Sequence, residues 1–483
     1  MKRQKIIYLV YLCATMTLYF LGTIAYLQAG EEWYDATYYT LQLFFMNYTP
    51  PASTCSLLYF VRFACPAITF TGLFSLMWGL VKKLSDRVAL LFPDATAIYY
   101  DILPDEAAIK SFRHAVLCGK KPQKAHSQVL MFSNDKDNLS FYANNTKKFK
   151  KNSKTYIMLE QTNSGLLTES NIYYANQYEI IARLYWKERN LLPYLNDNGC
   201  NVKIALIGFG NLGQKLLEYG LCNNIYCVNQ SIEYHIWGDS KVYRELLGSF
   251  DMMNKDLIIF HDENWKDAFS SLKNFDRIIL SCTPGMEIIQ AFVALNIDME
   301  IDCYNPHGIQ LSNIFTNKNL YTFGEQGIIL TEENIKTDKL YSDAKKLNYN
   351  FAVLYDKKSK YSWLRPDLDE VMEQLWQNLN GFTKGSNIAC TDYHEIRKLL
   401  LKTLNLSAES LSEEQIETLA ELEHIRWSRY HFINHWTYAE QRDNQKKLHP
   451  SLIPYHELSQ LEKDKDKEMI AMLFELERNT KKK

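Results

Sequence analysis

Two long stretches without a charged residue dominate the hydrophobic pattern near the N-terminus. The first covers Ile6 to Gln28 and the second covers Phe63 to Val81. Each is long enough to cross a hydrocarbon core, which a helix spans with about 20 apolar residues. The pattern therefore predicts two transmembrane helices and makes the lipid bilayer an expected partner.

Basic residues flank both stretches and predict their orientation. Arg62 stands just before the second stretch, where its long side chain can reach the interface. The other flanking cations are Lys2, Arg3, Lys5, Lys82 and Lys83. By the positive-inside rule both termini lie in the cytoplasm, at the inner (plasma) membrane of the cell. The alternative for the first stretch is a signal peptide, but the stretch exceeds the usual apolar region and a second one soon follows.

An aromatic, amphipathic segment, residues 33–48, lies between the two stretches. It is too short to cross a bilayer and suits a re-entrant or interfacial helix, which Pro50 and Pro51 would end. The chain thus has a transmembrane span, a short helix, a helix break and a second span. This is the order found in the pore of a two-span cation channel. In that interpretation Asn47, Tyr48 and Thr49 are pore residues.

Acidic residues support the pore interpretation, because Glu31, Glu32 and Asp35 would give its outer mouth a cation-attracting field. The filter sequence TVGYG is absent, so potassium selectivity does not follow. The alternative is a simple helical-hairpin anchor with an amphipathic loop.

After residue 83 the pattern changes to short β-rich apolar runs that alternate with helical stretches, which predicts parallel βαβ units. Between about 200 and 330 a complete doubly wound sheet is expected. Its strands after Val202 are expected at Ile232–Trp237, Leu257–His261, Arg277–Ser281, Met299–Cys303 and Leu320–Phe323.

A glycine-rich turn follows the first of these strands. It reads Gly208, Phe209, Gly210, Asn211, Leu212 and Gly213, and it matches the G-x-G-x-x-G fingerprint between a strand and a helix. The glycines allow a tight turn, and the helix N-terminus offers amide donors to a phosphate. Asp239 is the candidate for a ribose hydroxyl, although it lies 26 residues past Gly213 rather than about 20. The expected cofactor is NAD or another nucleotide. The alternative is a Rossmann-like scaffold that keeps its glycines for packing and binds no dinucleotide.

Residues 84–190 show a second, weaker α/β pattern, with strands expected at Arg87–Phe92, His114–Cys118, Gln128–Phe132 and Thr155–Leu159. The stretch SQVLMFSNDKDNLSFYANN followed by KTYIMLEQ resembles the later half of the RCK or TrkA-N regulatory domains of potassium channels and transporters. In those domains an acidic-Asn-Leu turn follows a strand, matched here by Asp137-Asn138-Leu139. Gly119 to Pro122 stands where a loop is expected, without a glycine fingerprint, so this copy is expected to be structural.

A histidine stripe marks the last long helix, which opens with the capping box Ser412 to Gln415 and is expected to run to about Asn434. The stripe consists of His424, Trp427, His431 and His435. Aligned histidines suggest zinc, but no cysteine or second carboxylate completes the set. A packing face is therefore expected, and no metal.

The same helix begins a block that resembles the RyR domain. The resemblance rests on AELEHIRWSRY (Ala420–Tyr430), HWTYA (His435–Ala439) and KKLHPSLIPYHEL (Lys446–Leu458), followed by Lys463 and Asp466. His435 and Ala439 depart from the glycines that the family tends to have. In bacteria such domains look like nucleotide-sensing modules of conflict and defence systems, so the resemblance implies a nucleotide-type small-molecule signal.

The residue types of this block suit such a signal. Trp427, Trp436 and Tyr438 could stack on a base, while Arg426, Arg429 and Lys447 could meet phosphates. The other ligand-binding candidates are Glu423, His424, His449, Pro450 and Tyr455. The alternative is that the tryptophans are core residues and the charges are solvated.

Composition limits the partners. The 54 Lys and Arg against 56 Asp and Glu give a formal net charge of −2, so no direct binding of nucleic acid is expected. Ten cysteines without a C-x-x-C pair are typical of reduced, structural cysteines.

The expected organisation is a membrane protein with five parts, and 483 residues are enough for several cores. The parts are a pore-like region at 1–83, a degenerate RCK/TrkA-N-like domain at 84–198, a Rossmann-like domain at 199–330, a helical connector at 331–406 and a mostly helical RyR domain at 407–483.

The resemblances imply a nucleotide-gated, ion-channel-like effector, a homo-oligomer (dimer or tetramer), with a role in anti-phage defence. One alternative is a membrane-tethered Rossmann oxidoreductase or nucleotide-consuming enzyme, whose candidates His261, Asp262, Cys282 and His307 merely fall near strand ends. No catalytic residue is therefore assigned. The other alternative is a nonconducting membrane scaffold.

Overall fold

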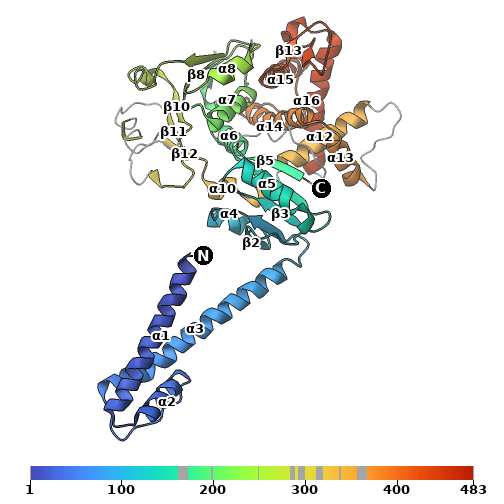
Figure 1. The fold of residues 1–483 in the computed structure, drawn as a ribbon. Helices are drawn as coiled ribbons and strands as arrows, with labels where there is room; N and C mark the ends of the chain where they lie inside the picture. The colour runs from blue at the N-terminus through green and yellow to red at the C-terminus, as the bar shows by residue number, and fades with distance from the viewer. Residues whose placement is uncertain are drawn as a thin grey trace. The chain divides into compact units, whose positions relative to one another are not determined.

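The computed structural model describes residues 2–160, 172–196, 199–248, 250–282, 289–291, 300–311, 319–336, 339–355 and 367–481. The chain divides into two compact units, Met1–Leu91 and Phe92–Lys483 (Figure 1).

The first unit consists of three helices, α1 (Lys2–Gln28), α2 (Trp33–Phe44) and α3 (Ser56–Ala89). By length and composition, α1 and α3 are each long and apolar enough to cross a membrane, over Val10–Gln28 and Ser56–Ser75. The second of these segments begins upstream of the expected Phe63, so Arg62 lies inside α3. Its guanidinium carbon sits 4.0 Å from the centre of the Tyr48 ring, a cation–π contact that offsets part of the cost of a charge in an apolar helix.

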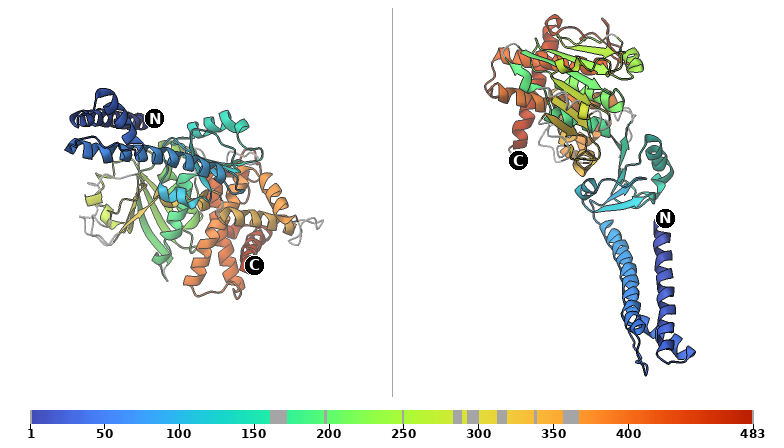
Figure 2. Two further views of the ribbon diagram at one scale, coloured as in Figure 1. Left: turned by 90° about the horizontal axis from the view of Figure 1, so that it is seen from below. Right: turned by 90° about the vertical axis from the view of Figure 1, so that its left-hand side faces the viewer.

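Helix α2 packs against α1 and α3 through a shared apolar core, to which it contributes Ala36, Leu43 and Phe44. The helix ends at Phe44 rather than near Tyr48, and residues 47–49 follow it as an irregular segment. The buried Tyr26 of α1 donates a hydrogen bond from its hydroxyl to the Thr49 carbonyl at 3.1 Å. Helices α1 and α3 meet near α2 and diverge toward the N-terminus of α1 (Figure 2).

The second unit begins with a five-stranded parallel sheet in the order β2-β1-β3-β4-β5. Its strands are β1 (Thr96–Tyr99), β2 (Ala115–Gly119), β3 (Ser127–Leu130), β4 (Lys154–Leu159) and β5 (Ile172–Asn176), and its helices include α4 (Glu106–Ser111) and α5 (Asp135–Asn145). This is a doubly wound order. The strand expected at 87–92 is wrong, because α3 continues through Arg87 to Ala89 and a turn follows.

The Asp137-Asn138-Leu139 motif lies in the first turn of α5 rather than in a free turn after β3. The Asn134 side chain caps this helix, accepting a hydrogen bond from the Asp137 amide at 2.8 Å. The buried Asn138 accepts from the Phe132 amide and donates to the Phe132 carbonyl, each at 3.0 Å. The motif therefore closes the connection between β3 and α5.

A second parallel sheet follows, in the order β12-β11-β10-β7-β8-β9, with the short antiparallel β6 (Leu195–Asn196) paired to β7. The main strands are β7 (Gly199–Ile207), β8 (Ser231–Trp237), β9 (Leu257–His261), β10 (Arg277–Leu280), β11 (Glu300–Tyr304) and β12 (Leu320–Phe323). Numbered along the chain, the order is 3-2-1-4-5-6, the order of a Rossmann sheet. The predicted parallel α/β fold is confirmed.

Side chains of β7 alternate between two buried faces, as a fully covered strand requires. Val202, Ile204 and Leu206 join the core formed with α6 (Gln177–Glu188) and α7 (Asn211–Asn223). Ala205 and Ile207 join a second core on the opposite face.

Helix α6 follows β5 of the first sheet but packs against α7 of the second. Trp186 is buried and donates a hydrogen bond from its indole nitrogen to the Leu216 carbonyl at 2.7 Å. Tyr185 donates to the buried Asp302 carboxylate at 2.6 Å. The two sheets therefore share this helix.

Helices make up most of the remaining chain (Figure 1). They are α8 (Lys241–Leu247), α10 (Gln326–Ile329), α11 (Glu332–Lys336), α12 (Lys339–Tyr355), α13 (Leu368–Gln377), α14 (Gly381–Thr403), α15 (Glu413–Ile433) and α16 (Gln460–Lys481), with the short β13 (Thr437–Tyr438) and β14 (Leu448–His449). The predicted capping box opens α15, with both of its hydrogen bonds present between Ser412 and Gln415.

One buried arginine joins α15 to the second sheet. The Arg429 side chain is fully buried and donates hydrogen bonds to the carbonyls of Met252 and Leu221 and to the Asn254 side chain. It also forms an ion pair with Asp256 at 2.7 Å, and neither side chain has exposed surface. Because a buried guanidinium is tolerated only when its donors are met, this network fixes α15 against the sheet.

We expect Arg429→Met to lower the melting temperature of the detergent-solubilised protein, since it leaves Asp256 buried without its cation. Such a loss destabilises by on the order of 3–5 kcal/mol. The matched control is Lys446→Met, because Lys446 and its partner Asp443 are exposed and 3.7 Å apart. Equal melting temperatures for the two variants would contradict a structural role for Arg429.

Candidate functional site

The glycine turn after β7 has the geometry that the fingerprint predicts. Gly208 has a φ of 96°, a conformation that favours glycine, and its amide donates to the Trp237 carbonyl at 2.9 Å. A Cβ on Gly213 would collide with the Gly208 carbonyl oxygen. A Cβ on Gly210 would meet nothing within 4 Å. Packing therefore accounts for Gly208 and Gly213, whereas the open space at Gly210 lies at the N-terminus of α7, where a phosphate could bind.

The remaining motif residues divide between core and surface. Phe209 and Leu212 are buried, and the Phe209 ring packs edge-on against Tyr243 at 5.0 Å. Asn211 is exposed. Only the backbone of this turn and the side chain of Asn211 are thus free to meet a ligand.

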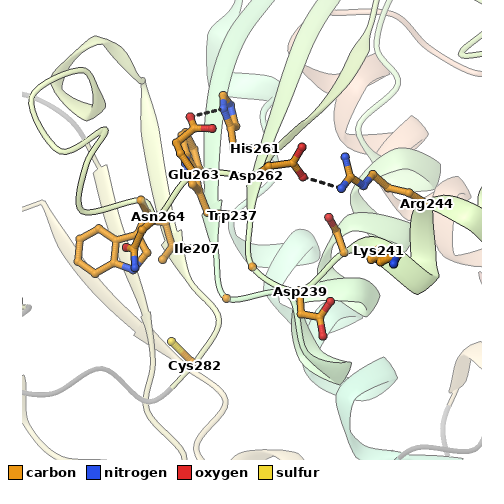
Figure 3. A pocket seen from close by; sticks show the side chains of 14 residues that line it. Ile207, Trp237, Asp239, Lys241, Arg244, His261, Asp262, Glu263, Asn264 and Cys282 are labelled. Carbon is orange, nitrogen blue, oxygen red and sulfur yellow. Dashed lines mark hydrogen bonds and ion pairs between the residues drawn. The ribbon is translucent and has the colours of Figure 1, made fainter.

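A cleft of about 680 Å³ opens beside the turn, at the carboxyl ends of β7, β8, β9 and β10 (Figure 3). Its walls are formed by Ile207, Gly208, Trp237, Gly238, Asp239, Ser240, Lys241, Arg244, His261, Asp262, Glu263, Asn264, Trp265 and Cys282. This is the switch point of the sheet, where ligands of open α/β sheets bind. The exposed Asp239 lies just after β8, the position from which a carboxylate can accept from a ribose hydroxyl.

Charges of both signs surround the cleft. Arg244 forms an ion pair with Asp262 at 2.6 Å, and Lys241 lies on the same helix as Arg244 (Figure 3). Neither cation was predicted from the sequence. A K-x-x-R pattern after a strand does not by itself indicate a binding site. It does so only when the strand ends that lie beside it in the sheet are known.

A stacked histidine pair crosses β8 and β9. The His235 and His261 ring nitrogens lie 2.8 Å apart, and His261 stacks on Trp237 with the ring centres 4.0 Å apart and an angle of 3° between the planes. His261 also lies 2.9 Å from Glu263 (Figure 3). Burial lowers the pKa of His235. The stacked rings of His261 and Trp237 build a flat wall for the cleft.

The enzyme candidates near the strand ends do not assemble into a reacting pair. His261 is held by the histidine pair and Asp262 by Arg244, while the exposed His307 does not line the cleft. Burial raises the pKa of the Cys282 thiol, the reverse of what an activated nucleophile needs. Among the described cleft residues, no hydrogen bond joins Cys282 to a base.

In the RyR-like module, the two arginines that were expected to contact phosphates, Arg426 and Arg429, are buried in ion pairs. Glu423 is buried and accepts from Arg397 at 2.7 Å and from Arg426 at 2.7 and 3.0 Å. Arg429 binds Asp256. These side chains stabilise the fold and are not available to a ligand, which corrects the expectation for Glu423, Arg426 and Arg429.

The other aromatic and imidazole candidates gather in one cluster. Trp427 packs against His431 and His449 with ring centres 3.9 and 4.9 Å apart, and Trp436 lies 5.3 Å from His431. The structure brings Trp427, Trp436 and His449 together, with His431 between them. Trp436 is buried, so it belongs to the core rather than to a stacking surface.

The three histidines of the predicted stripe are bound to backbone carbonyls, and His435 lies in the turn after α15 rather than on the helix. A ring nitrogen of His424 lies 2.8 Å from the Ile453 carbonyl, one of His431 lies 2.8 Å from the Trp427 carbonyl, and one of His435 lies 2.9 Å from the Leu246 carbonyl. In the part of the chain that the structure describes, no group of three or more ligands could hold a metal.

The outermost candidates differ in exposure. Tyr438 is 53% exposed, and the exposed Lys447 donates to the Asn434 carbonyl at 3.0 Å. Tyr455 is buried and donates to Glu417 at 3.0 Å, whereas Pro450 is half-buried. Tyr438 and Lys447 are therefore the most exposed candidates of this module, whereas Trp427 and Pro450 are half-buried.

The cluster predicts a pH dependence. Burial lowers the pKa of His431 to about 3 and that of His449 to about 4, from 6.5. Between about pH 6.5 and 4 these histidines bind protons in the unfolded chain but not in the folded chain. The free energy of unfolding therefore falls as the pH falls, by up to about 1.4 kcal/mol per pH unit for each histidine.

We expect the melting temperature of His449→Gln to depend less steeply on pH than that of the wild type. His456→Gln, at an exposed site, is the control, and equal slopes for His449→Gln and wild type would refute the account.

Comparison with known proteins adds one family. Residues 401–476 match the RyR domain family, which is not an enzymatic one, and this confirms the resemblance predicted from the C-terminal block. No curated protein matches the chain. Among solved structures, a glycerate dehydrogenase related protein from Thermoplasma acidophilum is 11% identical over 47% of this chain and 82% of that chain, with a TM-score of 0.18. That score is too low to support a structural argument, so the Rossmann assignment rests on the strand order, and only the C-terminal part of the chain is assigned by comparison.

Proposed function

We propose that the chain is a membrane effector in which a nucleotide, bound in the cleft at Gly208 with its phosphate at the neighbouring Gly210, controls the N-terminal helical unit. The observation that carries the proposal is the open glycine turn at the switch point of a Rossmann-order sheet. The same chain contains two helices long and apolar enough to cross a membrane. Such a chain combines a ligand site with an output that acts at a bilayer.

A short connection supports the coupling. Only residues 90–95 separate the end of α3 from β1. Within this stretch Phe92 stacks on His114 with ring centres 4.0 Å apart, and Asp94 lies 2.7 Å from a His114 ring nitrogen. Phe92 and Asp94 thus bind the residue that precedes β2, so the chain that follows α3 is attached to the first sheet by side-chain contacts.

In the proposed mechanism the ligand shifts the population toward a conducting state, by an amount that its differential affinity for the two states allows. The output is cation flux in a homo-oligomer, with Glu31, Glu32 and Asp35 attracting the cations. Asn47, Tyr48 and Thr49 would line the pore. Anti-phage defence is the proposed biological role, and failure of the expressed gene, with its neighbouring signalling genes, to protect cells from phage would argue against it.

We expect Gly210→Glu to abolish nucleotide binding in the cleft and ligand-triggered ion flux, because the new carboxylate would occupy the phosphate position at the α7 N-terminus and repel the ligand. The measurement is ion flux from liposomes that contain the full-length protein, with and without NAD, cyclic nucleotides and linear oligonucleotides.

Gly210→Ala is the matched control, since its methyl group meets no atom within 4 Å and the φ of −80° suits any residue. It should retain the fold and most of the flux. Ligand-dependent flux that survives Gly210→Glu would move the sensor elsewhere, and a protein that binds nucleotide but never conducts would favour a nonconducting scaffold.

A further inference from the structure

A second large cavity lies within the Phe92–Lys483 unit, where β5, α6, α7 and α8 meet the helices α11 to α15. We call it the junction cavity. Its volume is about 640 Å³, within the range of small-molecule sites, and none of its lining residues lines the cleft beside Gly210. It is therefore a separate place on the molecule.

The lining of the junction cavity carries an excess of positive charge, with six basic and three acidic side chains. The acids are already engaged within the lining: Lys215 forms ion pairs with Glu179 at 3.3 Å and Glu218 at 2.9 Å. Asp392 accepts a hydrogen bond from Asn223 at 2.8 Å. Two further cations of the lining pair with acids outside it, Lys336 with Glu332 at 2.7 Å and Lys345 with Glu373 at 2.5 Å.

Two lysines of the lining form no ion pair with any described residue. Lys384 of α14 is half-buried, and its ammonium makes only a 3.5 Å contact with the Gln377 carbonyl. Burial lowers the pKa of Lys384, and this effect outweighs the opposing attraction of the Glu373 carboxylate. Lys447 donates only to the Asn434 carbonyl. An anion in the cavity would satisfy both.

The cavity also offers flat aromatic walls. Tyr156 and Tyr173 stack with ring centres 5.0 Å apart and an angle of 18° between the planes. Trp376, Phe382 and Tyr430 line other parts of the wall. Aromatic rings beside cations are the surroundings in which a base and a phosphate are held together.

Two buried polar atoms in the lining residues lack a partner among the described residues. They are the side-chain oxygen of Asn223, a residue that is 3% exposed, and the hydroxyl of Tyr243. Native proteins rarely leave such atoms unpaired, because each unmet hydrogen bond is costly. They are the groups that a ligand with donors and acceptors would satisfy.

We propose that the junction cavity binds a nucleoside phosphate, as a second site that is independent of the cleft beside Gly210. Lys384 and Lys447 bind the phosphate, and the aromatic walls hold the base. Because the walls come from both sheets' helices and from α14 and α15, the occupant favours the arrangement of these elements that forms the cavity.

The test is calorimetric titration of the full-length protein in detergent with AMP, cyclic AMP, GMP, ADP-ribose and NAD. The protein carries Gly210→Glu in every case, which removes the first site. We expect at least one ligand to bind this protein, and Lys384→Glu in the same background to weaken that binding by about tenfold or more. Lys402→Glu, at an exposed position on the same helix, should leave the affinity unchanged.

Two further variants, Lys384→Gln and Lys447→Glu, test whether misfolding explains a loss of binding. The first keeps a polar side chain, and the second changes an exposed site. Each should weaken binding while the melting temperature stays that of the parent. No binding of any of the five ligands by the Gly210→Glu protein would overturn the proposal, and so would binding that the Lys384 and Lys447 variants leave unchanged. Neither result bears on the proposed function. That proposal fails instead if the ligand-triggered ion flux of the wild-type protein does not depend on Gly210.

Discussion

The burial of Arg429 is the constraint on which the second unit depends. A guanidinium without exposed surface can persist only if nearly every donor has an acceptor, and the acceptors here come from 208 to 173 residues earlier in the chain. The RyR-like helix α15 and the second sheet must therefore fold as one body. Tyr393 of α14 strengthens this junction with a hydrogen bond to the Ile225 carbonyl at 2.7 Å.

The packing of α15 against the second sheet makes the two proposed sites differ in what fixes their shapes. The cleft beside Gly210 is built from strand ends of a single sheet, so its shape is fixed by the sheet itself. The junction cavity is built from helices that belong to separate parts of the chain, so its shape depends on how those helices pack. A ligand in the cleft meets a preformed surface, whereas a ligand in the junction cavity would stabilise one packing arrangement over others.

Local patterns predicted what depends on local sequence. Strands β9 and β12 were predicted to the residue, because each is a short apolar run bounded by polar residues. The strand β1 was missed, because helix α3 continues past Lys82 and Lys83 and displaced the expected start of the sheet. Arg426 and Arg429 look like surface cations in the sequence. Arg429 is buried against Asp256, 173 residues earlier in the chain, whereas Arg426 pairs with Glu423 one turn away on the same helix, and only the fold shows that this local pair is buried. The lining of the junction cavity, drawn from residues 156 to 447, has no sequence signature at all.

The shared helix α6 bears on how the chain was assembled in evolution. If two independent α/β domains had simply been fused end to end, each sheet would pack against its own helices. Helix α7 would then be covered by residues of the second domain alone. Here Trp186 and Tyr185, encoded with the first sheet, fill the second one. A recombination point between residues 186 and 216 would separate Trp186 from the carbonyl that accepts its hydrogen bond, and would remove part of the core of the second module.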